Sequence, residues 1–335
     1  MATFNIYKLH FVSPLHISDQ CDDGSISMKT IQSDTLYAAL TSCLAKVGYK
    51  IPPDGDLGFT ISSMFPYYQE KSDSAPIYFL PMPFQTRLPE LTDVSKAKTI
   101  KKIRWIDSKL FTLVLQGKQF FDGTNEYYSH VHGSYFTEQP FPVEADEFVL
   151  SEVAQRVFME SRTGKKDALP YYMDRITFRD MSGLYFIAQG HVNLLEKALS
   201  LLALEGIGTD RNVGFGFFEY TTDVLTIDTP KDADHQMSLS ILIPDSESQL
   251  HQLLESSLVA YDFMRCGGWI TTYPYNTYRK NAIYGFLPGS VFSMTDSSDG
   301  VVGCIVNLSP QKEIQSIMHP IWRNGKSLML PIKLS

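Results

Sequence analysis

The sequence predicts an α+β fold built from two similar units, and three observations lead to that prediction. Stretches in which apolar and polar residues alternate are typical of half-buried strands, whereas apolar residues spaced three or four apart are typical of helices. Both patterns occur in each half of the chain, in the order strand, helix and further strands. The 335 residues are 44% hydrophobic, which suits two globular domains.

The first unit begins with a strand and a helix. Residues 4–11 alternate apolar and polar side chains and predict a half-buried strand. A helix follows, with Ser33 as its N-cap and Asp34 in the first turn, where a carboxylate is favourable. Apolar residues continue at helical spacing until Gly48 ends the pattern.

A second strand–helix pair comes after a long insertion, at about residues 50–180. Residues 183–190 predict a strand, and a helix then extends to Gly206 at its C-cap position. An aromatic strand follows at residues 215–220. The order β–α, insertion, β–α–β is compatible with a ferredoxin-like, or RRM-like, domain that covers residues 1–225.

The second unit covers residues 226–335. Residues 238–244 predict a strand, residues 246–258 a helix, and two later stretches further strands. This repeats the plan of the first unit and indicates a duplication of the fold, although no sequence repeat is visible.

Three features of the insertion leave alternatives open. Prolines in residues 64–68 and 77–83 exclude a central strand and predict an edge hairpin or an irregular connection. The basic run 96–105 predicts a solvated amphipathic helix or a contact with RNA or a partner. Residues 161–167 form a basic, glycine-centred tip between two strand-like flanks, which predicts a hairpin that projects from the body or lies on its surface.

Residues 205–218 are the richest in glycine. Glycine allows positive φ and close backbone approach, and successive N–H groups in such a turn can bind an anion. The alternative is a helix cap, a turn and a strand bulge without a ligand. The stretch does not fit the dinucleotide or P-loop fingerprints, since a helix precedes it where both motifs require a strand.

Composition and motifs weigh against several classes of protein. The formal net charge of −8 argues against a free-standing nucleic-acid binder, although a local basic groove can coexist with acidic faces. Scattered cysteines and the absence of a long apolar run predict a cytoplasmic protein without membrane contact. His130 and His132 lack neighbouring ligands, so we expect no metal and no cofactor. Hydrolase motifs are absent, and His16 is the best candidate for a general base.

Five motifs together resemble one known family. They are KLHFxSPLHI at 8–17, SDTLYAA at 33–39, GLYF at 183–186, GIGxDRxVGxGxF at 206–218 and GGWITT at 267–272. The chain resembles the fourth-subunit family of the Csm complexes, the type III-A CRISPR effectors, within the Cas-five-like group of RAMP proteins. The resemblance covers residues from the first strand to about 292, with nothing that aligns in about 85–175.

This resemblance implies two RRM-like RAMP domains and a thumb-like hairpin. It implies a non-catalytic subunit for antiviral defence that grips the repeat-derived 5′ tag of the crRNA. Such a subunit caps the complex, where it contacts the large polymerase-bearing subunit and the first backbone subunit, with target RNA nearby. The acidic net charge is then compatible with RNA binding, because acidic faces can contact partner subunits.

The resemblance also assigns candidate RNA-binding residues. The glycine-rich loop supplies the first set: Gly206, Gly208, Thr209, Asp210, Arg211, Asn212, Gly214 and Gly216. Candidates for the thumb are Arg162, Lys165, Lys166 and Arg175. The opposite side of the tag site is assigned to His16, Ser33 and Asp34, and Arg279 and Lys280 are the contribution of the second domain by analogy.

Two other functions remain as alternatives. One is a RAMP-type endoribonuclease that matures the crRNA with His16 as its base, which lacks a convincing second acid–base group. The other is a structural adaptor in which the glycine-rich loop is only a tight turn.

Overall fold

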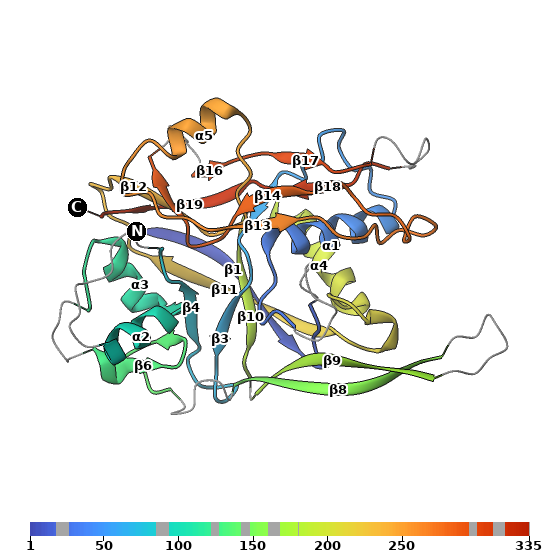
Figure 1. Cartoon of the computed structure of the whole chain (residues 1–335), viewed down its shortest axis with the longest axis horizontal. Coiled ribbons are helices and arrows are strands. Elements are labelled where there is room, and N and C mark those ends of the chain that lie inside the picture. Colours follow the sequence, from blue (N-terminus) through green and yellow to red (C-terminus); the bar gives the residue numbers. More distant parts are fainter. Residues whose placement is uncertain are drawn as a thin grey trace.

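A mixed sheet forms the centre of the N-terminal half (Figure 1). The structure, a computed structural model, describes residues 1–17, 27–84, 94–121, 127–141, 148–159, 168–179, 181–294, 300–310 and 319–334. The strand order is β11-β1-β10-β3-β4-β5-β7-β6, with β2 also paired to β10. Only the β5–β7 pair in this sheet is parallel among the described residues. The strands are β1 (Ala2–Phe11), β2 (Phe59–Ile61), β3 (Phe65–Tyr68), β4 (Ile77–Pro81), β5 (Trp105–Asp107), β6 (Val131–His132), β7 (Tyr135–Phe136), β10 (Gly183–Gly190) and β11 (Phe218–Ile227).

The strand β1 is an interior strand of this sheet, between β10 and the edge strand β11. Tyr7 is opposite Phe186 on one side and Thr222 on the other. Tyr7 belongs to the hydrophobic core on one face of the sheet, and Ile6 belongs to the core on the other face. The prediction of a strand is therefore confirmed, but the strand is covered on both faces instead of being half-buried.

Two long helices cover the first face: α1 (Ser33–Lys46) and α4 (Val192–Glu205). Leu36 and Leu40 of α1 pack into the same core as Leu195 and Leu199 of α4. Both helices lie where the apolar spacing predicts them. The N-cap prediction is wrong by one residue, since Gln32 precedes the first helical residue, Ser33, and makes no side-chain capping bond.

The second face of the sheet is covered by α3 (Ser108–Leu115) and by strands of the C-terminal half. Asp107 caps α3, because its carboxylate accepts hydrogen bonds from the backbone of Lys109 and Leu110. Phe111 of α3 shares one core with Met237 and Leu328 from the C-terminal sheet. The two halves of the chain are therefore joined by a continuous hydrophobic core.

The insertion contains more sheet than predicted. The prolines of 64–68 and 77–83 predict an edge hairpin, but β3 and β4 are interior strands of the sheet. Pro66 and Pro81 occupy the register positions opposite Leu184 and Trp105. The basic run 96–105 begins in the helix α2 (Val94–Lys102), which precedes β5. A helix is one of the two alternatives predicted for this run. A short 3-10 turn, η1 (Tyr128–His130), precedes β6.

The C-terminal half is built differently from the N-terminal half. Its main sheet has the order β15-β12-β19-β16, and two separate hairpins join β13 to β14 and β17 to β18. The order β12, α5, β13, β14 matches the predicted order of strand, helix and two strands, but β12 and the β13–β14 hairpin belong to separate sheets, so a repeat of the first plan is not apparent among the described residues. The elements are β12 (His235–Ser238), α5 (Glu247–Leu253), β13 (Phe263–Cys266), β14 (Ile283–Phe286), β15 (Val291–Ser293), β16 (Val301–Val302), β17 (Ile305–Asn307), β18 (Trp322–Asn324) and β19 (Ser327–Ile332).

The predicted strand 238–244 has the wrong bounds. The ladder of β12 ends at Ser238, and the next residues bond to separate neighbours. The backbone N–H of Leu239 donates to Leu328, and that of Ile243 donates to Gly325. The predicted helix 246–258 also ends early, at Leu253.

A long hairpin extends away from the body, formed by β8 (Val149–Met159) and β9 (Ala168–Phe178) (Figure 1). Leu15 pairs with Ile176 and fixes the base of the hairpin to the end of β1. The hairpin predicted from its two flanks is therefore present, whereas Arg162, Lys165 and Lys166 lie outside the described residues. No helix in the described part of the chain is long and apolar enough to cross a membrane.

Candidate functional site

The glycine-rich loop connects α4 to β11 through a series of left-handed residues. Gly206 caps α4 with φ of 77°, and Gly208 and Gly214 follow with φ of 98° and 96°. Asp210 has φ of 59° and precedes the short 3-10 turn η3 (Arg211–Val213). Such positive φ values are costly for residues with a side chain, so the glycines determine the path of the loop.

Most of the glycines are required by contacts within the chain itself. The loop lies on the segment that follows β1: the N–H of Gly216 donates to Pro14 at 2.8 Å, and the N–H of Thr209 donates to His16 at 3.0 Å. A Cβ at Gly208 would lie 2.5 Å from the carbonyl oxygen of His16. A Cβ at Gly216 would collide with the carbonyl group of Ile207. A Cβ at Gly206 would likewise lie 2.7 Å from the carbonyl oxygen of Phe215, so close approaches account for three of the four motif glycines without any ligand.

The tip of the loop, residues 209–214, is different. A Cβ built on Gly214 meets no atom within 4 Å, so this glycine faces open space. Thr209 and Asn212 are exposed, and the side chain of Arg211 is 38% exposed. The tip therefore presents backbone and polar side chains outward, as a surface for an anionic ligand requires.

The charges around the tip are unevenly paired. Glu205 forms an ion pair with Lys46 at 2.5 Å, while the guanidinium of Arg211 lies 3.9 Å from the same carboxylate. One carboxylate thus serves two cations, and Arg211 makes only the longer contact. The exposed edge of α1 and the loop therefore carries a local positive charge on an acidic protein.

A third cation, Arg156, ties the loop to the long hairpin. Arg156 of β8 pairs with Asp210 at 2.9 Å, and its guanidinium lies 4.5 Å from the ring centre of Phe215. Arg156 thus holds the one described non-glycine residue with a positive φ. Sequence reasoning missed Arg156, since nothing in its neighbourhood distinguishes it from other strand residues.

His16 is not placed as a contact or a catalytic base would be. Its side chain is only 3% exposed, and Nδ1 donates to the backbone oxygen of Asp174 at 2.6 Å. The carboxylate of Asp174 instead accepts from the Ser151 hydroxyl and the Ser27 N–H. His16 therefore fixes β9 to the end of β1, and its buried ring argues against the predicted position beside the RNA tag.

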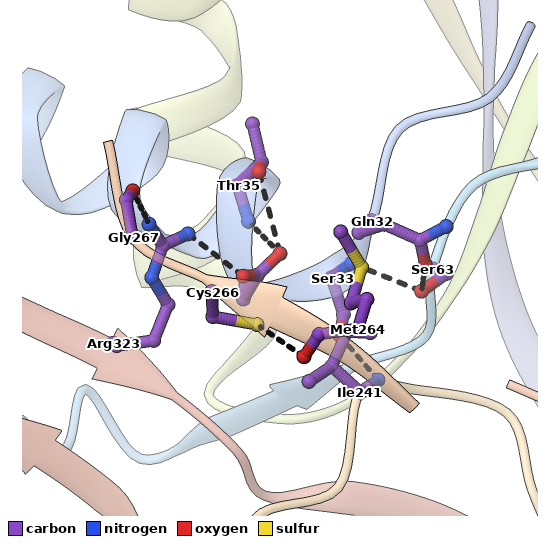
Figure 2. Close-up of polar contacts among 10 residues, drawn as sticks. Gln32, Ser33, Thr35, Ser63, Ile241, Met264, Cys266, Gly267 and Arg323 are labelled. Carbon is purple, nitrogen blue, oxygen red and sulfur yellow. Dashed lines mark hydrogen bonds and ion pairs between the residues drawn. The ribbon is translucent and has the colours of Figure 1, made fainter. Parts of the chain in front are cut away.

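Ser33 and Asp34 are likewise buried, at the junction of the two halves. The hydroxyl of Ser33 accepts a hydrogen bond from the N–H of Ile241 at 2.9 Å. Asp34 pairs with Arg323 at 2.7 Å, and both side chains are nearly inaccessible to solvent. Figure 2 shows Arg323 between Gly267 and the start of α1. Their partners are protein groups, so the prediction that they face RNA is corrected.

Arg279 and Lys280 lie on a turn beyond β13, near this junction. The guanidinium of exposed Arg279 lies 4.8 Å from the ring centre of Trp269. Burial, together with the charge of Arg323, lowers the pKa of Lys280 to about 8. Arg279 is therefore available to a ligand, whereas Lys280 is half-buried.

The last described candidate residue is Arg175, and a metal site is the other possibility to consider. Arg175 lies on β9 and pairs with Glu152 across the hairpin at 2.7 Å. Within the described ranges, no group of three or more His, Cys, Asp or Glu side chains could hold a metal ion.

The chain was compared with known protein families and sequences. The family model described as the CRISPR Csm4 C-terminal domain matches residues 231–332. The CRISPR system Cms protein Csm4 of Thermococcus onnurineus strain NA1 is 26% identical over 256 residues, which cover 71% of this chain and 75% of the relative. The protein of the same description from Streptococcus thermophilus is 24% identical over 306 residues, covering 88% and 90%.

Solved structures share the fold. A chain in the crystal structure of a Csm3–Csm4 subcomplex of the type III-A CRISPR–Cas interference complex aligns with a TM-score of 0.62 at 17% identity, covering 99% of this chain and 100% of that one. A chain of the Csm1–Csm4 cassette in complex with cA4 aligns with a TM-score of 0.57 at 18% identity, covering 100% and 99%. The family match over residues 231–332 and the relatives thus agree with the resemblance that the motifs indicate, and the chain is similar to Csm4 subunits of type III CRISPR effector complexes.

Proposed function

We propose that this chain grips the repeat-derived 5′ tag of a crRNA through the exposed tip of its glycine-rich loop. The observation that carries the proposal is the contrast within the loop: its other glycines pack against the chain itself, whereas the tip faces outward beside Arg211 and Lys46. Open left-handed backbone and a partly paired arginine suit a phosphate backbone.

The subunit would cap the complex beside a polymerase-bearing subunit and a backbone subunit. Related folds were solved with Csm1 and with Csm3, according to the names of those complexes. The centre of the N-terminal sheet supports a ferredoxin-like RAMP domain, because β11, β1, β10 and β2 follow the order 4-1-3-2 with α1 and α4 on one face. The boundaries 1–225 and 226–335, and an RRM-like second domain, remain predictions.

The β8–β9 hairpin would act as the thumb, close to guide and target RNA. Val153, Val157 and Tyr172 share one face by their register, and all three are exposed. Exposed apolar side chains on a projecting hairpin suit contact with bases. Arg175, Arg162, Lys165 and Lys166 would supply charge there.

We propose no catalytic step for this subunit. The endoribonuclease alternative depends on His16, whose ring is buried and bonded to a backbone oxygen. A general base has to reach the proton that it removes. Unchanged precursor processing by a reconstituted complex that carries His16→Gln would agree with a structural role, and a loss of cleavage without a loss of assembly would support the alternative.

The main test measures binding of a 5′-tag RNA at several salt concentrations. Arg211→Gln should weaken binding and reduce the slope of log K against log salt by about 0.7, the value for one phosphate contact on a single strand. Lys71→Gln, at an exposed lysine in the turn between β3 and β4, is the matched control and should change neither. Unchanged affinity and slope for Arg211→Gln would favour the structural-adaptor alternative.

A further inference from the structure

Exposed aromatic side chains gather on a second hairpin, formed by β13, β14 and the turn between them. Phe263 is 54% exposed and Tyr284 is 61% exposed, and their rings meet edge to face at 5.7 Å. The backbone pairing continues beyond β13. Trp269 and Arg279 form an isolated antiparallel β-bridge, and the N–H of Ile270 donates to the carbonyl oxygen of Tyr278. Trp269 is itself 53% exposed. Large aromatic side chains so exposed usually mark a binding surface.

Two of the exposed aromatic side chains, Tyr284 and Trp269, have a cation beside them. Arg265 lies directly opposite Tyr284 in the ladder, and Arg279 stacks on Trp269. Residues 261–284 contain three cations, the third being Lys280, and one carboxylate, Asp262. The hairpin is thus positive within a chain of net charge −8.

This combination fits single-stranded nucleic acid better than a protein partner. Proteins that bind single strands combine cations, which follow the phosphates, with aromatic rings on which bases stack. Aromatic residues and arginine are also common in protein–protein interfaces, so the stacked pair at Trp269 alone does not identify the partner. The excess of three cations over one carboxylate favours a phosphate backbone, and therefore RNA.

The hairpin lies near one end of α1, and the glycine-rich loop lies near the other. Gly267, two residues before Trp269, accepts a bond from Arg323, which pairs with Asp34 in the first turn of α1. Lys46, in the last turn of α1, pairs with Glu205 beside the loop. The 14 residues of α1 span about 20 Å, a distance that a short unpaired RNA segment can cover.

We infer that this hairpin is a base-stacking surface for unpaired nucleotides of the RNA whose backbone the glycine-rich loop holds. Trp269 is its main stacking platform, Phe263 and Tyr284 form a second one, and Arg265 and Arg279 contact phosphates. The inference rests on the proposed function, since the loop has to hold the same RNA.

The experiment measures the affinity of the full chain, assembled with its partner subunits, for a 5′-tag RNA carrying 4-thiouridine. Trp269→Ala should lower affinity about fivefold or more and remove crosslinks to this hairpin, whereas Trp269→Phe should retain most of both. Arg279→Gln should reduce the salt slope by about 0.7. Met294→Ala, at an exposed apolar side chain outside the hairpin, is the control and should have no effect.

Two results would overturn the inference. One is unchanged affinity and crosslinking for Trp269→Ala. The other is loss of a partner subunit with RNA affinity retained, which would assign the hairpin to a protein interface. Arg211→Gln in the same assay separates the two proposals. If Arg211→Gln weakens binding and Trp269→Ala does not, only the stacking surface is refuted. If neither variant weakens binding, the proposed function of the loop is refuted as well.

Discussion

The glycine-rich loop and the start of α1 share polar residues at a helix end but differ in their exposure to solvent. Both place small or polar residues at a helix end, and both are predicted to contact RNA. The loop exposes its tip, while Ser33 and Asp34 are buried against Ile241 and Arg323. The difference teaches that residue type identifies a need for a polar partner, and that distant parts of the same chain decide whether that partner is supplied from within the chain.

The largest expected effect comes from breaking the buried pair. Asp34→Ala should lower the free energy of unfolding by about 3–5 kcal/mol, because it leaves the charge of Arg323 buried without its partner. Urea denaturation measures this loss. The double variant Asp34→Leu with Arg323→Met should be less destabilised than Asp34→Ala alone. A wild-type denaturation curve for Asp34→Ala would show that the pair is not structural.

Substituting alanine for two glycines of the loop compares the energetic cost of a steric clash with the cost of backbone strain alone. Gly216→Ala adds a Cβ that collides with Ile207 and should cost about 3 kcal/mol. Gly214→Ala, with positive φ but open space, should cost about 1–2 kcal/mol from backbone strain alone. Thermal unfolding of both variants gives the ranking. Equal losses would contradict the division of the loop into a packed base and an open tip.

The Arg156–Asp210 pair tests whether the hairpin positions the loop. Arg156→Met should weaken tag-RNA binding about fivefold, because about 1 kcal/mol that holds Asp210 in its left-handed conformation is lost. Asp210→Gly in the same background should restore binding, since glycine adopts that conformation without help. RNA titrations at one salt concentration compare the variants. Failure of the rescue would indicate that Arg156 contacts RNA directly.

The smallest expected effect is a pH dependence at Lys280, whose side chain is only partly buried and therefore partly screened by solvent. Its pKa falls from 10.5 to about 8 in the folded chain. The unfolded chain therefore binds more protons between these values, and the free energy of unfolding should rise with pH from about 8 to 10. Buried tyrosines such as Tyr37, whose pKa is raised, oppose this trend above pH 10. Lys280→Met should flatten the rise, and an identical pH profile would contradict the shift.

The sequence predicts the N-terminal half better than the C-terminal half, for a physical reason. The helices α1 and α4 are 14 residues long, so their apolar spacing repeats often enough to be recognised. Strands of the C-terminal half span two to six residues, too few for alternation to show. Prolines misled the prediction for β3 and β4, because each interior strand accommodates a single proline in its ladder.

The candidate site could be predicted only in part. The glycines predict an unusual backbone path. The exposure of residues 209–214, however, depends on how the loop packs on the segment after β1. Arg323 and Arg156 carry no local signal, since each acts through a partner far away in the sequence. Long-range pairing of this kind is invisible to periodicity and spacing.

The pair between Asp34 and Arg323 joins residues 289 positions apart. During translation, the carboxylate of Asp34 therefore leaves the ribosome long before its partner is made. The N-terminal sheet can form in the nascent chain, but its junction with the second half closes only when β18 and β19 emerge. A chain terminated before β18 would retain an uncompensated charge at the place where its halves should meet.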